Sequence, residues 1–245
     1  MIPKIIHYCW VGGNPLTPLA QKCIASWKKH CPDFEIIRWD ETNYDFSKNQ
    51  YMAQTYEAKK WGFVPDYARL DIIYQYGGIY LDTDVEIVKP LDELLNNAAF
   101  CGVENFCQNG ITIALGLGFG AEPGHPLIKE MMDDYENLRF YNQDGSLNLT
   151  ASPVYQTAFL TKKGLLNVDK IQTVSGMTVY PKQYFNPTNL DTGRIQLTNK
   201  TVSIHHYAAS WLDDKSKLRY AVHKFLNRTI GIERTEWIRR KLLKK

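Results

Sequence analysis

Residues 77–86 read Gly77-Gly78-Ile79-Tyr80-Leu81-Asp82-Thr83-Asp84-Val85-Glu86, an apolar run that ends in two aspartates separated by a threonine. Alternate side chains of an extended segment point to the same face. A strand over residues 79–88 therefore predicts that Asp82 and Asp84 project together. Two carboxylates on one face repel each other unless a cation lies between them, and carboxylate, water and phosphate oxygens suit Mg²⁺ or Mn²⁺. The stretch predicts a divalent-metal site that holds a diphosphate; the alternative is a pair of surface aspartates at a strand end.

Strand and helix patterns alternate along the chain on either side of this stretch. Buried strands are predicted at 4–11, 34–39, 79–88, 99–103, 111–115, 178–180 and 201–205, and helices at 17–30, 51–61, 66–76, 125–138, 154–161 and 213–227. Such alternation predicts an α/β protein with a mainly parallel, Rossmann-type central sheet flanked by helices. We expect one domain over residues 1–212 and a C-terminal helical segment over residues 213–245.

The composition is that of a soluble globular protein. The chain has 245 residues, of which 44% are hydrophobic and 22% are charged. No apolar run approaches the roughly 20 residues that span a bilayer, and the first residues lack a secretory signal pattern. The five cysteines are odd in number and form no C-x-x-C pair. We therefore expect a reduced, cytoplasmic protein.

The charge is distributed unevenly. The net charge is +3, but residues 213–245 alone carry +7, so residues 1–212 carry −4. Apolar residues, including Trp237, Leu242 and Leu243, interrupt the basic ones in this tail. Two interpretations stay open: a solvated terminal helix that packs by its apolar side, or peripheral docking at an anionic leaflet of a membrane. Nucleic acid is not an expected partner, because the body is acidic and carries no nucleic-acid module.

Several motifs occur together in a characteristic order. They are Ile5-Ile6-His7-Tyr8-Cys9-Trp10-Val11-Gly12-Gly13, Ser26-Trp27, Asp66-Tyr67-Ala68-Arg69, Gly77 to Asp84, and Ser210-Trp211. By these motifs the chain resembles the DXD-containing sugar transferases of glycosyltransferase family 32 and, more distantly, the glucosyltransferase domains of large clostridial toxins. The resemblance implies a GT-A-like fold, a nucleotide-sugar donor, Mn²⁺ or Mg²⁺ as cofactor, and transfer with retention of configuration.

The resemblance also implies roles for individual residues. Asp66, Arg69, Asp82 and Asp84 would form the catalytic group. Asp82, Asp84 and His206 would be the metal ligands. The donor would be bound by Cys9, Trp10, Asp66, Arg69, Tyr80, Asp82, Asn109, Ser210 and Trp211, with Trp10 stacked on the nucleobase and Ser210-Trp211 over the diphosphate.

Each role competes with a structural alternative. Asp66 and Arg69 share a helix face, so they form either a hexose clamp or an exposed ion pair. Trp10 ends the first strand, where ligands of open α/β sheets bind, or it belongs to the core. Neighbouring histidines of a strand face opposite ways, so at most one can reach a given site; we select His206 over a purely structural role. Ser210-Trp211 is either a closing loop or a helix cap with a packing tryptophan.

These features together predict a retaining, metal-dependent hexosyltransferase. The expected donor is UDP-galactose or UDP-glucose, and the expected acceptor is a lipid-linked glycan in bacterial capsular or exopolysaccharide assembly. One alternative is a metal-dependent phosphohydrolase, which would also use paired aspartates. The other is a glycan-binding protein with a decayed transferase site.

Overall fold

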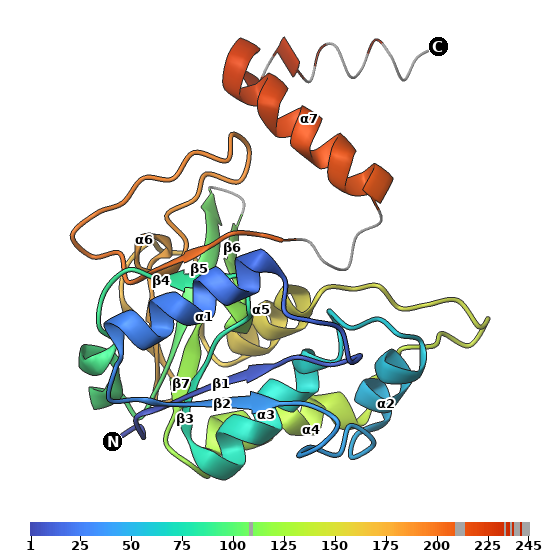
Figure 1. The fold of residues 1–245 in the computed structure, drawn as a ribbon, viewed down its shortest axis with the longest axis vertical. Coiled ribbons are helices and arrows are strands. Elements are labelled where there is room, and N and C mark those ends of the chain that lie inside the picture. The colour runs from blue at the N-terminus through green and yellow to red at the C-terminus, as the bar shows by residue number, and fades with distance from the viewer. Residues whose placement is uncertain (108–109, 209–213, 233, 236, 238–240, 242–245) are drawn as a thin grey trace.

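The computed structural model describes residues 1–107, 110–208 and 214–232, together with Arg234, Thr235, Trp237 and Lys241 (Figure 1). An eight-stranded sheet forms its centre in the order β2-β1-β3-β7-β5-β9-β8, with β6 paired to β5. The strands of this sheet are β1 (Ile5–Cys9), β2 (Glu35–Trp39), β3 (Gly78–Tyr80), β5 (Ala99–Cys107), β6 (Gly110–Ile113), β7 (Phe119–Ala121), β8 (Gln172–Val174) and β9 (Met177–Tyr180). A separate two-stranded sheet joins β4 (Val85–Ile87) to β10 (Ser203–His205).

Helices cover both faces of the central sheet, which confirms the predicted α/β class (Figure 1). Parallel pairings join β1 to β2 and β3, and β5 to β9, whereas β7 runs antiparallel between β3 and β5. The helices are α1 (Pro18–His30), α2 (Gln50–Glu57), α3 (Pro65–Tyr76), α4 (Pro126–Glu136), α5 (Ser152–Lys162), α6 (Lys182–Phe185) and α7 (Asp214–Ile230), with 3-10 turns η1 (Asp92–Asn96) and η2 (Leu115–Leu117).

Helices α1 and α3 begin and end within a residue of their predicted bounds, whereas α2 ends at Glu57, four residues before its predicted end. Thr17 caps α1, because its side-chain oxygen accepts a hydrogen bond from the Ala20 backbone N–H at 3.2 Å. α3 starts at Pro65, whose missing N–H costs nothing in the first turn. It stops at Gly77, which adopts φ +66°, a conformation that side chains disfavour.

The predicted strand over residues 79–88 is the main difference from expectation. β3 ends at Tyr80 and β4 begins at Val85, and a hydrogen bond from the Val85 N–H to the Asp82 carbonyl closes a turn between them. β3 belongs to the central sheet and β4 to the small sheet. The chain therefore leaves one sheet for another at the two aspartates, so a period-two strand does not orient them.

Two hydrophobic cores lie on the two faces of the sheet. Ile79 belongs to the core with Trp27 of α1, whereas its neighbour Tyr80 belongs to the core with Leu70 of α3. This split follows from the alternation of side chains along β3. The indole N–H of Trp27 also donates to the Val85 carbonyl at 2.7 Å, which ties α1 to the start of β4.

Within the described residues, no helix is long and apolar enough to cross a bilayer. All five cysteines are free, and four of them are buried. α7 extends away from the sheet beyond the segment that follows β10 (Figure 1).

Candidate active site

The turn between β3 and β4 brings Asp82 and Asp84 together with a histidine. Asp82, Asp84 and His205 each offer one ligand atom, and these atoms lie within 4.8 Å of one another. The Asp82 N–H donates to the Gly116 carbonyl at 3.0 Å, and the Ala208 N–H donates to Asp84 Oδ2 at 2.8 Å. Two carboxylates and an imidazole form a donor set suited to a divalent cation such as Mn²⁺. The residues present thus fit the predicted metal site.

The histidine beside the aspartates is His205, and not the predicted His206. His205 ends β10, which pairs antiparallel with β4, and its Nε2 lies 3.1 Å from Asp84 Oδ1. His206 contacts Glu86 instead, with 2.7 Å between Nε2 and Oε2. Adjacent side chains of an extended segment point to opposite sides. One histidine therefore lies beside the two aspartates, as expected, but it is His205 and not His206.

Mutual attraction sets the protonation of the Asp84 and His205 pair. Burial alone would raise the pKa of Asp84, but the His205 imidazole and the Ala208 N–H outweigh it, so the pKa lies below its ordinary value. Burial alone would lower the pKa of His205, yet Asp84, Asp82 and Glu104 raise it overall. The site therefore favours positive charge, supplied by an imidazolium or by a metal ion.

Arg69 connects the start of α3 to the turn that carries the two aspartates. Its Nη2 lies 3.0 Å from Asp66 Oδ1 and 3.4 Å from Asp82 Oδ1, and its Nε donates to the Pro65 carbonyl at 3.0 Å. Asp66 and Arg69 are each only 3% exposed, so the alternative of a surface ion pair is excluded. Burial raises the pKa of Asp66 to about 6, against the opposing effects of Arg69 and a hydrogen bond from Ser152.

Gly116 makes room for this arrangement and was not singled out from the sequence. A Cβ at position 116 would overlap Asp82 Oδ2 and lie 3.0 Å from Arg69 Nη1. Gly116 is not among the residues with positive φ, so its small size matters here and not its backbone freedom. The glycine lies in η2, between two leucines, and nothing in that local pattern predicts its proximity to the aspartates.

The predicted donor-binding residues of β1 and β3 differ in exposure. Cys9 and Tyr80 are 7% and 1% exposed within the core, and burial raises the pKa of the Cys9 thiol to about 12. The Tyr80 ring lies under the Arg69 guanidinium, with 5.2 Å between the guanidinium carbon and the ring centroid. Trp10 is half-buried, and its indole N–H donates to the Asn14 carbonyl at 2.6 Å. Cys9 and Tyr80 thus lie behind the site, while part of Trp10 is accessible.

Further polar residues surround His205 and were also not predicted. Glu104 is close enough to His205 to raise its pKa, and burial raises the pKa of Glu104 itself. The Asn186 amide donates to the Glu104 carbonyl at 2.7 Å and to the Tyr207 hydroxyl at 2.5 Å. Asn186 follows α6, which is far from Glu104 in sequence, so only the tertiary fold reveals the cluster.

Three predicted donor-binding residues, Asn109, Ser210 and Trp211, lie outside the described residues, so their roles stay predictions. Gln156 of α5 is buried, and its Oε1 accepts from the Leu115 N–H at 2.9 Å. This bond anchors the turn that carries Gly116.

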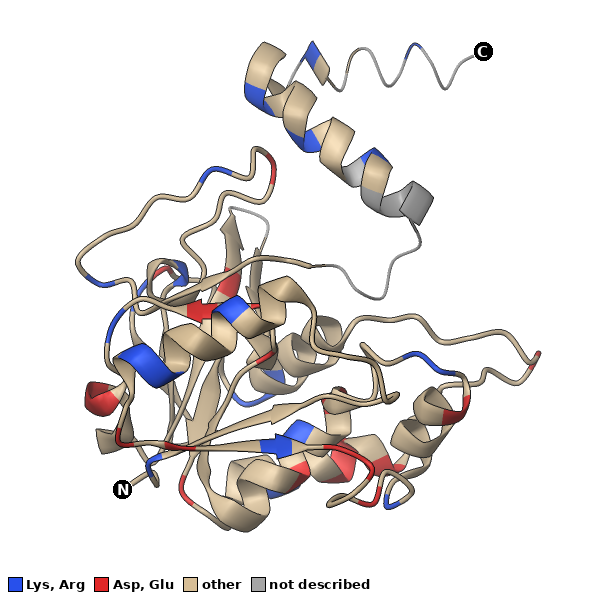
Figure 2. Cartoon of the chain, in the orientation of Figure 1, with Lys and Arg blue, Asp and Glu red and all other residues tan. Residues whose placement is uncertain are grey.

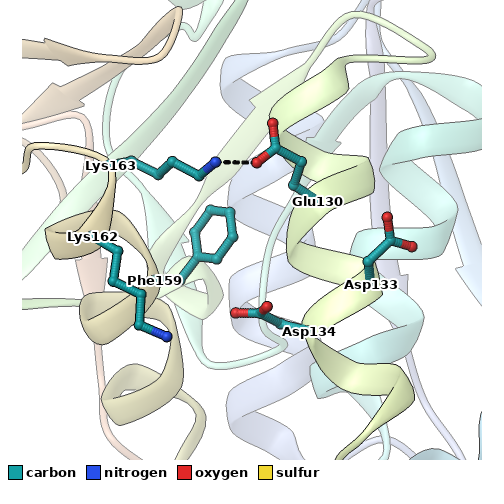
Figure 3. Close-up of a pocket in the computed structure, with 6 residues that line it drawn as sticks. All are labelled: Glu130, Asp133, Asp134, Phe159, Lys162 and Lys163. Atoms are coloured by element: carbon teal, nitrogen blue, oxygen red, sulfur yellow. Dashed lines mark hydrogen bonds and ion pairs between the residues drawn. The ribbon is translucent and has the colours of Figure 1, made fainter.

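Two surface hollows share no residue with the site. One lies between α4 and α5, where Lys163, which follows α5 directly, forms an ion pair with Glu130 of α4 (Figure 3). Its lining residues are Glu130, Asp133, Asp134, Phe159, Lys162 and Lys163. The other lies beside the end of α7 and is lined by Thr192, Asn227, Ile230, Gly231, Ile232 and Arg234.

The Asp-x-Asp turn thus follows a strand of the mixed central sheet and contacts a buried Asp–Arg pair. Residues 18–101 match the family model described as a glycosyltransferase sugar-binding region containing a DXD motif. The matched region includes both aspartates of the turn.

Parts of the chain are also similar in sequence to proteins that are named as glycosyltransferases. The chain is 26% identical over 170 residues to inositol phosphoceramide mannosyltransferase 1 of Schizosaccharomyces pombe, covering 63% of this chain and 50% of that protein. It is 26% identical over 199 residues to an uncharacterized glycosyltransferase of Acanthamoeba polyphaga mimivirus, covering 78% and 75%. A 77-residue segment is 39% identical to human alpha-1,4-N-acetylglucosaminyltransferase, covering 31% and 19%.

Among solved structures, the PaToxG glycosyltransferase aligns with a TM-score of 0.49 and 19% identity, covering 66% of this chain and 70% of that one. The match to the S. pombe mannosyltransferase spans half of the length of that protein.

Proposed function

We propose that this protein is a retaining glycosyltransferase of GT-A type that transfers a hexose from a nucleotide sugar to a glycan hydroxyl. The observation that carries the proposal is the cluster of Asp82, Asp84 and His205 ligand atoms within 4.8 Å of one another. The family match over residues 18–101 supports it.

The residues of the site would divide the work as follows. Asp82, Asp84 and His205 would hold the cation. When bound, the cation would stabilise the negative charge that develops on the leaving diphosphate. Arg69 holds Asp82 by an ion pair at 3.4 Å, so it orients one metal carboxylate. Asp66, held by Arg69 at 3.0 Å, offers a carboxylate oxygen to a sugar hydroxyl.

The donor and acceptor are part of the proposal. UDP-glucose and UDP-galactose are the first donors to test. The S. pombe relative is named a mannosyltransferase that acts on inositol phosphoceramide, so a mannose nucleotide belongs in the same panel. A lipid-linked acceptor in cytoplasmic assembly of bacterial surface polysaccharide is the proposed setting.

Release of the nucleoside diphosphate from each donor, with and without Mn²⁺, tests the proposal. We expect Asp84→Ala to lower this rate about 10²-fold, since it removes a carboxylate that stabilises the transition-state charge through the ion. Asp144→Ala is the control, because Asp144 lies in an exposed loop and accepts hydrogen bonds from Ser146. Equal rates for wild type and Asp84→Ala would refute the proposal.

The product distinguishes the remaining alternative functions. A metal-dependent phosphohydrolase would release inorganic phosphate, whereas a transferase acting on water releases nucleoside diphosphate and free hexose. A glycan-binding protein with a decayed site would show no metal-dependent binding of nucleotide by calorimetry.

A further inference from the structure

The C-terminal helix α7 exposes its apolar side to solvent. Leu218, Val222 and Phe225 are 66%, 49% and 64% exposed. These positions are spaced by four and three residues, so they lie on one face of the helix. A helix that stabilises a fold by its apolar stripe buries such residues. In α7, the residues of the apolar stripe are exposed to solvent instead.

The polar side of α7 contacts the rest of the protein. Asn227 is 3% exposed, and its amide donates to the Asp191 carbonyl at 2.9 Å. Lys224 lies over the Tyr207 ring, with 5.7 Å between Nζ and the ring centroid. The sequence left open whether the tail packs by its apolar side; the described part of α7 packs by its polar side instead.

Basic residues flank the apolar face on both sides. With 3.6 residues per turn, Arg219 and Arg228 project about 90° to either side of the line through Leu218, Val222 and Phe225. Both arginines are exposed, and basic positions recur along the α7 ribbon (Figure 2). Long basic side chains beside an apolar stripe can extend toward headgroups while the stripe enters the acyl boundary.

Exposed apolar residues continue beside the helix. Ile195 and Leu197 lie on the segment that follows Asp191, which contacts α7, and they are 46% and 59% exposed. Trp237, beyond the helix, is 58% exposed. Tryptophan is enriched at membrane–water interfaces.

The net charge of the C-terminal segment indicates which kind of partner could bind this surface. Residues 213–245 carry +7 and the rest of the chain −4. A second copy would bring one +7 tail against another, which disfavours a dimer through this face. A nucleic acid would attract the basic residues but offers no apolar layer in which Leu218 and Phe225 could be buried. An anionic bilayer offers both negative charge and an apolar layer.

We propose that α7 docks on an anionic lipid bilayer, with Leu218, Val222 and Phe225 in the interfacial layer and Arg219 and Arg228 toward the headgroups. The inference does not depend on transferase activity. If the chain is a transferase, the docked helix would hold the Asp82–Asp84 site near a membrane-bound acceptor.

Sedimentation with vesicles tests the proposal. The probes are vesicles of phosphatidylcholine alone and vesicles of equal parts phosphatidylcholine and phosphatidylglycerol. We expect wild type to bind the mixed vesicles at least about tenfold more tightly than the neutral ones, because basic residues add attraction to anionic lipid. We expect the double variant Leu218→Ser/Phe225→Ser to lose at least about tenfold of the binding to mixed vesicles, because it removes buried apolar area.

Matched variants separate this face from general effects. Val154 and Leu166 are 58% and 61% exposed, so Val154→Ser/Leu166→Ser removes equally accessible apolar groups outside α7 and should leave binding unchanged. Arg219→Gln/Arg228→Gln should weaken binding to mixed vesicles, while Lys29→Gln/Lys170→Gln, at exposed positions outside α7 and the segment beside it, should weaken it less. Helical circular dichroism of each variant checks that α7 still folds.

Three results would overturn the proposal. Equal vesicle binding by wild type and Leu218→Ser/Phe225→Ser would exclude the apolar face. A wild-type dimer in light scattering, dispersed by the same double variant, would assign the face to a second copy. Tight binding of an oligonucleotide without vesicle binding would assign the tail to nucleic acid. Donor hydrolysis by the double variant should match wild type, so failure of the proposed function and failure of membrane docking are distinguishable.

Discussion

Two adjacent histidines contact different carboxylates, and this separation decides which of them lies at the proposed metal site. His205 Nε2 lies 3.1 Å from Asp84 Oδ1, whereas His206 Nε2 lies 2.7 Å from Glu86 Oε2. Glu86 is also paired with Lys22 at 2.7 Å, so this second cluster is already neutralised without a metal ion. His205 can therefore serve as the test position and His206 as its control.

We expect His205→Asn to raise the Mn²⁺ concentration for half-maximal donor hydrolysis at least about tenfold, the lower end of the loss seen when groups supporting a metal are removed. His206→Asn should leave that concentration within about twofold of wild type, and it breaks only the contact to Glu86. Titration of donor hydrolysis with Mn²⁺ for the three proteins measures both effects. The reverse order, with His206→Asn the more impaired, would restore His206 as the ligand.

Residues that form a recognisable motif could be predicted from the sequence to lie together, whereas neighbours brought in by the tertiary fold could not. Asp82 and Arg69 were predicted from D-x-D and D-x-x-R, and the structure places their side-chain atoms 3.4 Å apart. That His205, and not His206, lies beside Asp84 could not be predicted, because the direction of each side chain depends on how the short strand pairs with β4. Gly116 was missed because it contributes only the absence of a side chain.

At the scale of elements, the turn between β3 and β4 is held against η2. The Asp82 N–H bonds to the Gly116 carbonyl at 3.0 Å, and Gln156 of α5 anchors Leu115 at 2.9 Å. The strand pattern of residues 79–88 is continuous in sequence, so periodicity could not reveal that the segment changes sheets. β7 was also not predicted, since three residues of low local signal form a strand only between two neighbours.

We expect Gly116→Ala to lower donor hydrolysis at least about tenfold, because a displaced ligand of a metal site costs at least as much as a lost supporting group. The added methyl group would overlap Asp82 Oδ2 and force the carboxylate away from Arg69. Overpacking should also lower the free energy of unfolding by about 1–3 kcal/mol. Chemical denaturation and the donor assay measure the two effects separately.

Gly102→Ala is the matched control for overpacking. A Cβ there would lie 2.6 Å from Phe185 Cδ2, in the core and not at the aspartates. We expect a similar loss of stability with donor hydrolysis near the wild-type rate. If Gly102→Ala and Gly116→Ala lose activity equally, the effect follows from general destabilisation and Gly116 has no special relation to Asp82.

At the scale of the whole molecule, buried His7 joins two strands of the central sheet to the end of helix α3. It lies in β1, its Nε2–H donates to the Gly77 carbonyl at the end of α3 at 2.9 Å, and its Nδ1 accepts from the Trp39 indole N–H of β2 at 3.0 Å. The side chain is fully buried. Burial lowers the pKa of His7 to about 4, despite the favourable bond to Gly77. Protonation at Nδ1 would also oppose two N–H donors.

The lowered pKa predicts how global stability depends on pH. In the unfolded chain, His7 takes up a proton near its ordinary pKa of about 6.5. In the folded protein, it takes up this proton only near pH 4. The contribution of His7 is fully present above pH 6.5 and is lost as pH falls from 6.5 to 4. A difference of this size corresponds to about 3 kcal/mol. Urea unfolding at a series of pH values would measure it.

His7→Gln separates this effect from the titration of the carboxylates. The variant should be less stable at neutral pH, and its free energy of unfolding should fall less steeply between pH 6.5 and 4, by up to about 1.4 kcal/mol per pH unit, the slope for one proton. His30→Gln, at the end of α1, is the control for replacing a histidine elsewhere in the fold. An unchanged slope in His7→Gln would show that His7 takes up its proton equally in the folded and unfolded states. The three-element junction would then be stable with a charged imidazole.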